Sequence, residues 1–272
     1  MKYDREGLCL SYDDLGDGPA VILIHGFPLN RQMWLPQAKA VTGAGFRLIT
    51  PDLRGFGESE PGTGVYSMDT FADDLIALMD RLEIKKAVVG GMSMGGYVLL
   101  NLLARHPDRI IAPCFIVTRS GADDEAGKAK RKAMADDVRA FGARIAADIF
   151  AKLLFAEETT GKKPEMVAQV SAWMQAANPV GMAGGLLAIG DRQDYTPLLG
   201  RITMPSLVIG ATEDRAMARE NFDILVSGLP HASNCMIAGA GHMVNMEKAD
   251  EFNACLLKFL QELKDGTASG CN

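Results

Sequence analysis

The residues best suited to chemistry begin with a serine between glycines, in the sequence Gly-Met-Ser-Met-Gly at 91–95. An apolar run at 87–89 precedes this segment, and an apolar stretch follows it. The pattern is typical of a sharp turn between a strand and a helix that exposes a serine hydroxyl. Gly91 and Gly95 suit such a turn because larger side chains would collide with the neighbouring backbone. We interpret Ser93 as a nucleophile, against the alternative of a glycine-rich turn with an incidental serine.

Four histidines could supply the base that a serine nucleophile requires. His106 lies at the polar end of the helix expected after the turn, and His231 lies in a surface turn. His25 follows the first apolar run directly. His242 follows the last apolar run, and in a parallel sheet that position lies on the same edge as Ser93. We therefore predict that His242 is the base.

The acid that orients the histidine should also follow a strand. Glu213 and Asp214 come shortly after the apolar run at 207–209, and both have suitable chemistry. We favour Asp214 and keep Glu213 as the alternative. The order along the chain is then Ser93, the acid and His242. Agreement of three positions in order and in strand context is more specific than any single motif.

The strands that must position these residues are expected at six short apolar runs, at 20–24, 47–50, 87–89, 113–117, 207–209 and 235–238. Runs of this length suit strands buried on both faces of a parallel sheet. Apolar residues at helical spacing lie at 71–82 and 252–263, and residues 97–103 are apolar almost all round, which predicts a buried helix. Strands alternating with helices predict an open, mainly parallel α/β sheet with right-handed crossovers.

The alternation stops between about residue 120 and residue 193. This segment predicts a helix at 123–155, a glycine-containing turn at 159–161, and further helices around 165–177 and 181–189. We expect residues 120–193 to form a helical cap, inserted into a core made of residues 1–119 and 194–272. The tail at 266–270 is expected to fray.

Composition and charge narrow the class of protein. The 272 residues are 48% hydrophobic and 23% charged, which suits one compact domain rather than a disordered chain. The net charge of −6 argues against a nucleic-acid binder that follows phosphates. No apolar run approaches the length of about 18 residues that a membrane span needs.

The expected compartment is the reducing cytoplasm. Residues 1–6 are charged and lack the apolar stretch of a signal peptide. The cysteines are odd in number and scattered, at Cys9, Cys114, Cys235, Cys255 and Cys271. Cys114 and Cys235 lie in apolar runs, where a free thiol behaves as a small hydrophobe. We therefore predict a cytoplasmic protein with reduced cysteines.

Motifs for cofactors and metals are missing from the sequence. It contains no complete G-x-G-x-x-G, no P-loop pattern, no H-E-x-x-H and no cysteine–histidine cluster, so we expect no cofactor and no metal. A basic run, Lys-Ala-Lys-Arg-Lys, lies at 128–132 in the expected cap. We interpret it as a solvated helix face, with a docking patch for an acidic carrier protein as the alternative.

The chain resembles the α/β-hydrolases over nearly its whole length. The sequence His-Gly-Phe-Pro at 25–28 is similar to the oxyanion loop of that family, and residues 51–59 are similar to its D-x-R-G-x-G-x-S turn. Gly-Ala-Gly-His at 239–242 is similar to its histidine loop. The likeness is greatest to small esterases and lactonases, among them 3-oxoadipate enol-lactonases, cofactor-free haloperoxidases and pimeloyl-carrier-protein methyl esterases. One departure is Ala211, where relatives usually have glycine three residues before the acid, which leaves Glu213 and Asp214 both open.

The resemblance implies an α/β-hydrolase fold and a serine hydrolase that cleaves a carboxylic ester or lactone through an acyl-enzyme. It also implies an oxyanion hole made by the backbone N–H groups of Phe27 and Met94, supported by His25 and Gly26. Serine at position 93 excludes the aspartate-type chemistry of dehalogenases and epoxide hydrolases. The same residues could instead catalyse perhydrolysis or carbon–carbon bond hydrolysis, and a small-ligand receptor is the alternative of another class.

Overall fold

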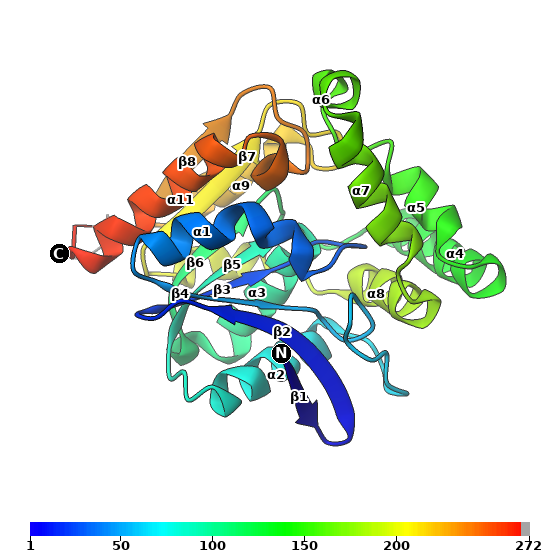
Figure 1. Ribbon diagram of the computed structural model, residues 1–272, viewed down its shortest axis with the longest axis horizontal. Helices are drawn as coiled ribbons and strands as arrows, with labels where there is room; N and C mark the ends of the chain where they lie inside the picture. The colour runs from blue at the N-terminus through cyan, green and yellow to red at the C-terminus, as the bar shows by residue number, and fades with distance from the viewer. Residues whose placement is uncertain (268–272) are drawn as a thin grey trace.

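A single sheet organises the molecule (Figure 1). The computed structural model describes residues 1–267, and within them eight strands lie in the order β1-β2-β4-β3-β5-β6-β7-β8. The strands are β1 Lys2–Arg5, β2 Leu8–Leu15, β3 Ala20–Ile24, β4 Arg47–Pro51, β5 Ala87–Met92, β6 Ile110–Ile116, β7 Ser206–Ala211 and β8 Ala232–Ile237. All pairs from β4 to β8 are parallel, whereas β2 pairs antiparallel with both β1 and β4.

The predicted parallel strands are confirmed, and two edge strands were not predicted. The six apolar runs overlap β3 to β8, with the runs at 113–117 and 235–238 extending one residue past their strands, and every residue of β3 and β5 is buried. Such burial on both faces is what makes the runs continuously apolar. β1 and β2 contain several charged residues and are partly exposed, so they lack that signal.

Helices cover both faces of the sheet because alternate residues of each strand point to opposite sides. Val21 and Leu23 of β3 pack in one layer with the helices α1 and α11, while Ile22 and Ile24 pack in the other with α2, α3 and α9. The bounds are α1 Leu35–Gly43, α2 Met68–Arg81, α3 Met94–Arg105, α9 Arg219–Gly228, α10 Val244–Glu247 and α11 Ala249–Lys264. Among the described residues, no helix has the length and apolarity that crossing a membrane requires.

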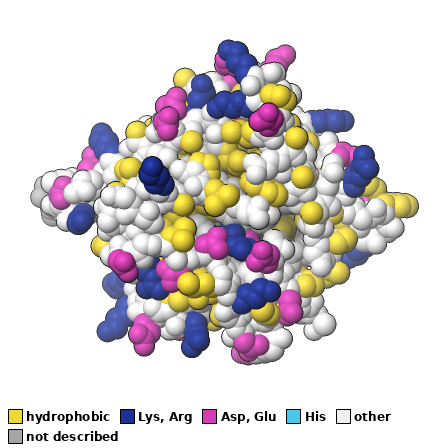
Figure 2. All heavy atoms as spheres, in the orientation of Figure 1, with side chains coloured by type: hydrophobic (Ala, Val, Ile, Leu, Met, Phe, Trp, Pro, Cys, Tyr) yellow, Lys and Arg dark blue, Asp and Glu magenta, His cyan; other side chains and the backbone are white. Residues whose placement is uncertain are grey.

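The chain between β6 and β7 is helical, and we call residues 120–193 the cap segment. Its helices are α4 Glu125–Phe141, α5 Arg144–Phe150, α6 Glu157–Lys162, α7 Pro164–Gln175 and α8 Pro179–Asp191. They lie together on one side of the molecule, coloured green to yellow-green in Figure 1. In the same orientation, Figure 2 shows hydrophobic side chains gathered near the centre of the view, with a group of acidic and basic side chains just below them and further charged side chains toward the edge.

Two details of the predicted cap segment are wrong, whereas its last two helices, α7 and α8, are confirmed. The long helix expected at 123–155 is broken at Gly142, whose φ of +91° ends α4. The turn expected at 159–161 belongs to the short helix α6. Acidic residues in the first turn of α6 and Lys162 in its last turn interact favourably with the helix dipole. This stabilisation outweighs the low helix propensity of Gly161.

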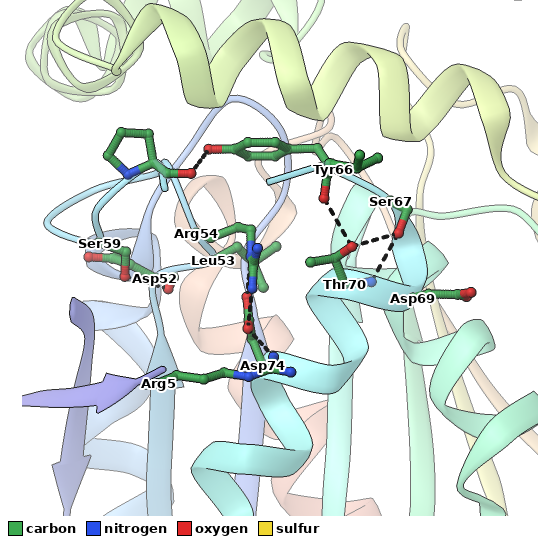
Figure 3. A network of polar contacts seen from close by, with 12 residues as sticks. Arg5, Asp52, Leu53, Arg54, Ser59, Tyr66, Ser67, Asp69, Thr70 and Asp74 are labelled. Atoms are coloured by element: carbon green, nitrogen blue, oxygen red, sulfur yellow. Dashed lines mark hydrogen bonds and ion pairs between the residues drawn. The ribbon is translucent and has the colours of Figure 1, made fainter. Parts of the chain in front are cut away.

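The cap helix α8 approaches the core through glycines. A Cβ atom on Gly181 would lie 1.9 Å from the carbonyl oxygen of Gly55, and one on Gly184 would lie 2.4 Å from the Tyr66 ring. Figure 3 shows Tyr66 beneath this helix, with its hydroxyl donating to the carbonyl oxygen of Pro61 at 2.6 Å. The glycines therefore allow α8 to rest directly on the loop after β4.

The expectation of reduced cysteines is wrong for one pair. Cys235 of β8 and Cys255 of α11 form a disulfide with their Cα atoms 6.4 Å apart. The packing of α11 against β8 brings them together across 20 residues, and a scattered spacing does not reveal such a pair. Cys9 and Cys114 are free thiols, while Cys271 and the end of the tail, from residue 268 on, lie outside the described residues.

Candidate active site

Ser93 lies on a strained turn between β5 and α3. Its φ of +52° and ψ of −113° are unfavourable for a residue with a side chain. The Ser93 N–H donates to the carbonyl oxygen of Ile116 at 3.0 Å, and Thr118 Oγ1 donates to the Ser93 carbonyl oxygen at 2.7 Å. Ser93 is partly exposed, although Met92 and Met94 on either side are buried. The turn thus holds the serine firmly while leaving it accessible.

The glycines around Ser93 are sterically required. A Cβ atom on Gly91 would lie 2.2 Å from the carbonyl oxygen of Gly95. One on Gly95 would lie 2.4 Å from the carbonyl oxygen of Ile24. Real Cβ atoms do not approach backbone so closely, and backbone cannot move aside as a flexible side chain can. Gly91 therefore permits the tight turn into α3, and Gly95 permits that turn to sit against the end of β3.

His242 and Asp214 meet at the carboxyl edge of the sheet. The distance from His242 Nδ1 to Asp214 Oδ2 is 2.8 Å, and both side chains are 3% exposed. The other carboxylate oxygen, Oδ1, accepts the backbone N–H groups of Ala216 at 2.8 Å and Met217 at 2.9 Å. These contacts hold the carboxylate in one orientation, which fixes the imidazole in turn.

Glu213, the alternative acid, is differently placed. It is exposed, and its Oε1 accepts only a long hydrogen bond of 3.5 Å from Thr212 Oγ1. Its own N–H donates to the carbonyl oxygen of Ala240 at 2.9 Å, so it supports the loop through its backbone. Of the two carboxylates left open by the sequence, only that of Asp214 contacts His242.

His25 acts through its hydrogen bonds to two loops. Its Nε2 accepts the backbone N–H of Leu53 at 3.0 Å, and its Nδ1 donates to the carbonyl oxygen of Gly26 at 2.9 Å. The ring is fully buried, and burial lowers the pKa of His25 below its usual value. His25 is therefore a neutral imidazole that ties the loop after β3 to the turn after β4.

Two backbone donors point to the surroundings of Ser93. Met94 is the first residue of α3, so its N–H is among those that a helix cannot bond internally. Within residues 1–267, neither this group nor the Phe27 N–H donates to a protein acceptor. Gly26 lies directly beside the serine, because a Cβ atom there would be 3.4 Å from Ser93 Cβ.

The turn after β4 is held by charged side chains, shown in part in Figure 3. Asp52 accepts the backbone N–H of Arg31 at 2.7 Å and pairs with its guanidinium group. Arg54 donates to both carboxylate oxygens of Asp74 at 2.6 Å, and Arg5 pairs with the same carboxylate. These pairs fix the turn after β4, whose Leu53 N–H donates to the buried His25 ring.

A carboxylate that was not predicted lies behind the histidine loop. Glu247 is 2% exposed; its Oε1 accepts the Gly241 N–H at 3.0 Å and its Oε2 accepts the Ala156 N–H at 2.9 Å. It therefore joins the residue before His242 to the cap segment. The only signal in the sequence is a glutamate that ends an otherwise buried stretch, Val244–Glu247.

The basic run of the cap segment is largely neutralised on α4 itself. Lys128 and Lys132 each pair with a carboxylate of the same helix, at 2.8 and 2.9 Å. Arg131 instead donates from Nε to the buried carboxylate of Asp123 at 2.8 Å. Among the described residues, no group of three or more histidine, cysteine, aspartate or glutamate side chains is placed to hold a metal ion.

These features define an α/β-hydrolase. Residues 19–249 match the family described as the alpha/beta hydrolase fold, so the chain belongs to that family and the resemblance seen in the sequence is confirmed. A thermophilic esterase from Thermogutta terrifontis, solved with malate bound, is 33% identical, with a TM-score of 0.92 over 94% of each chain.

Two further relatives differ in their named activities. The enol-lactonase from Burkholderia xenovorans is 28% identical, with a TM-score of 0.89 over 96% of this chain and 100% of its own. The non-heme chloroperoxidase CPO-A1 of Kitasatospora aureofaciens is 30% identical over 279 residues, covering 95% of this chain and 98% of its own. The fold is therefore shared by ester-cleaving and halogenating relatives.

Proposed function

We propose that this α/β-hydrolase cleaves a carboxylic ester or lactone, with Ser93 as nucleophile, His242 as base and Asp214 as the orienting acid. The observation that carries the proposal is the hydrogen bond of 2.8 Å between His242 Nδ1 and Asp214 Oδ2 at the sheet edge that also bears Ser93. With Nδ1 engaged by the acid, Nε2 is left to exchange a proton with the serine hydroxyl.

The mechanism follows from these roles. His242 Nε2 takes the hydroxyl proton as Ser93 Oγ attacks the carbonyl carbon, and the Asp214 carboxylate stabilises the imidazolium. The tetrahedral intermediate collapses to an acyl-enzyme as His242 returns the proton to the departing alkoxide. Water, deprotonated by His242, then attacks the acyl carbon and releases the acid and the free serine.

The backbone N–H groups of Phe27 and Met94 are proposed to bind the oxyanion of that intermediate. Both lack a protein acceptor within the described residues, and Met94 begins α3, where the helix dipole favours negative charge. Preorganised donors of this kind typically contribute about 10²–10³ in kcat.

The cap segment is proposed to cover this site as a lid, with residues 1–119 and 194–272 as the catalytic core. Phe150 of α5 supports this assignment, because its ring centroid lies 5.1 Å from that of Phe27. The Glu247 carboxylate adds a second connection from the cap to the histidine loop.

Perhydrolysis is a second candidate, favoured by the similarity to a non-heme chloroperoxidase. Hydrogen peroxide would then replace water in the attack on the acyl-enzyme and release a peracid. Assays with and without hydrogen peroxide at equal ester concentration distinguish hydrolysis from perhydrolysis. Only perhydrolysis produces a peracid, which is detected by its oxidation of halide.

Two further expectations from the sequence remain predictions. An acidic carrier protein would dock on α4, where Lys128 and Lys132 already have carboxylate partners. Lys130→Glu should then weaken turnover of a carrier-bound ester more than that of a free ester. The cytoplasmic location also remains a prediction, which the Cys235–Cys255 disulfide does not favour.

The test is steady-state hydrolysis of p-nitrophenyl acetate, butyrate, octanoate and laurate by the wild type and by Ser93→Ala. We expect multiple turnovers that disappear in the variant, with unchanged thermal unfolding as evidence of folding. Activity that survives in Ser93→Ala would show that the nucleophile has been wrongly assigned. The chain length with the highest kcat/KM measures the depth of the acyl site.

A further inference from the structure

A pocket of about 570 Å³ lies between the cap helices α4, α5 and α8 and the loop after β7. This volume suits a small organic ligand. One side is apolar and includes Met134, Phe150 and Leu186. The other side is polar and carries several basic side chains. The pocket therefore combines an apolar wall with a charged wall.

Two residues that line the pocket are next in sequence to residues of the proposed catalytic site. Arg215 in its wall directly follows Asp214. Arg119 directly follows Thr118, whose hydroxyl bonds the Ser93 carbonyl oxygen. Phe150, which lines the pocket, lies with its ring centroid 5.1 Å from that of Phe27, the residue after the glycine that lies beside Ser93. The pocket is therefore close to the loop that is proposed to hold the reacting carbonyl.

The charged wall contains more positive than negative groups. Arg119, Arg131 and Arg192 all pair with the single carboxylate of Asp123. Arg131 Nε donates to Oδ2 at 2.8 Å and Arg192 Nη1 donates to Oδ1 at 3.0 Å. The pocket itself is lined by four basic side chains, those of Arg119, Lys130, Arg131 and Arg215, and by two acidic ones, those of Asp123 and Asp124, in a chain whose net charge is −6.

Two of the three arginines of this cluster, Arg119 and Arg131, are accessible and line the pocket. The side chains of Asp123 and Arg192 are only 2% and 1% exposed, whereas those of Arg119 and Arg131 are 29% and 25% exposed. Asp123 and Arg192 thus form the buried part of the cluster, and Arg119 and Arg131 form its accessible part. Asp124, the other acidic residue of the wall, is occupied as the cap of α4, where its Oδ1 accepts the Gly127 N–H at 2.7 Å.

Several donors of this wall are not used by the protein. Arg119 Nε is buried and has no hydrogen-bond partner in the described structure. Arg131 is bonded there through Nε alone, which leaves both of its Nη groups. Lys130, which also lines the pocket, forms no ion pair with any residue from 1 to 267. Such unpaired donors beside a charge excess are what a carboxylate ligand needs.

We propose that this pocket binds a carboxylate at the far end of the substrate, so that the enzyme acts on esters or lactones that carry a second, anionic group. The inference rests on the proposed function, because it takes the reacting carbonyl to lie at Ser93. The apolar wall would accommodate the carbon chain between the carbonyl and the carboxylate.

The experiment compares two esters with acyl groups of five carbons, the p-nitrophenyl monoester of glutaric acid and p-nitrophenyl pentanoate. We expect the wild type to favour the charged ester in kcat/KM by about tenfold, the value of one charge-assisted hydrogen bond, and this preference to shrink with added salt. In Arg131→Gln the ratio of the two kcat/KM values should fall by about tenfold, mainly through KM. The matched control is Lys132→Gln, one residue along α4 and outside the pocket, which should leave the ratio unchanged.

Arg131→Gln removes a partner of the buried Asp123 carboxylate and could therefore disturb folding. Lys130→Gln provides a second variant without that effect, because Lys130 pairs with no buried group among the described residues. It should lower the same ratio by a smaller factor. Preference for pentanoate in the wild type, or an unchanged ratio in both pocket variants, would overturn the proposal. Failure of the proposed function gives a different result, since neither ester would then be turned over by the wild type, or both would be turned over by Ser93→Ala.

Discussion

The proposed catalytic site at the sheet edge and the pocket of the cap segment differ in how completely their charged groups are paired. At the sheet edge the orienting acid and the buried histidine are fully paired: Asp214 has His242 and two backbone N–H groups, and His25 has one donor and one acceptor. In the cluster beside the pocket, the carboxylate of Asp123 pairs with three guanidinium groups, two of which line the pocket. A matched set needs no outside partner and serves to hold a geometry. An unmatched set is completed by a ligand.

Disrupting the matched pair at the sheet edge should have the largest effect. In Asp214→Asn the amide can donate to Nδ1, which favours the wrong imidazole tautomer, and we expect kcat to fall by about 10⁴. Steady-state kinetics with p-nitrophenyl butyrate measures this loss. Glu213→Gln is the matched control, because this exposed neighbour does not contact His242, and its kcat should stay within about twofold. A larger loss in Glu213→Gln than in Asp214→Asn would assign the acid to the other residue.

Removing the only carboxylate of the pocket cluster should affect stability more than chemistry. Asp123→Asn leaves the buried Arg192 without a counter-ion, and we expect the free energy of unfolding to fall by about 3 kcal/mol. Urea titration measures the change, and Asp124→Asn serves as an exposed control that loses at most the cap of α4. If the pocket binds a carboxylate, added glutarate should raise the free energy of unfolding of the wild type in the same titration. Equal stability of Asp123→Asn and the wild type would mean that the buried Arg192 does not need the Asp123 carboxylate as its counter-ion.

Glu247 joins the histidine loop at the sheet edge to Ala156 of the cap segment, so its substitution tests whether these two segments are coupled. Glu247→Gln replaces one of two buried acceptors by an amide donor that faces an N–H group, and we expect a loss of about 2 kcal/mol in stability. If the carboxylate also positions the histidine loop, kcat should fall while KM for p-nitrophenyl butyrate changes little. A normal unfolding midpoint with unchanged kinetics would contradict both roles.

The smallest expected effect is the pH dependence caused by His25. Because burial lowers its pKa, the folded protein keeps this imidazole neutral while the unfolded chain takes up a proton below about pH 6.5. The contribution to stability is therefore present above that pH and is lost as the pH falls, at up to about 1.4 kcal/mol per pH unit. Urea unfolding at pH 7.5 and 5.5 should show a steeper loss for the wild type than for His25→Gln. Identical slopes would mean that His25 titrates normally in the folded protein.

The central strands could be predicted from the sequence because they are buried on both faces. β3 is apolar at every position, whereas β1 and β2 lie at an edge of the sheet and mix charged with apolar residues. Helix ends in the cap segment were harder to predict, since α6 depends on charges in its first and last turns rather than on an apolar stripe.

The candidate site was predictable where local sequence carries a steric or chemical requirement. Ser93 is marked by glycines that the close backbone demands. The choice between Glu213 and Asp214 depends on a shift of one residue in a loop, which the sequence does not determine. Glu247 and the Asp123 cluster could not be predicted, because their partners lie far away in the chain, 91 residues for Ala156 and 69 for Arg192.

The most direct test of Ser93 as the nucleophile is to trap it covalently. Incubation with a fluorophosphonate, followed by peptide mass spectrometry, should give one adduct, on the peptide that contains Ser93 and on its hydroxyl, with no labelling of Ser93→Ala. Loss of esterase activity in parallel with this labelling would confirm that the modified residue is the catalytic one. An adduct on another residue of the active enzyme, or inhibition of Ser93→Ala by the same reagent, would contradict the assignment.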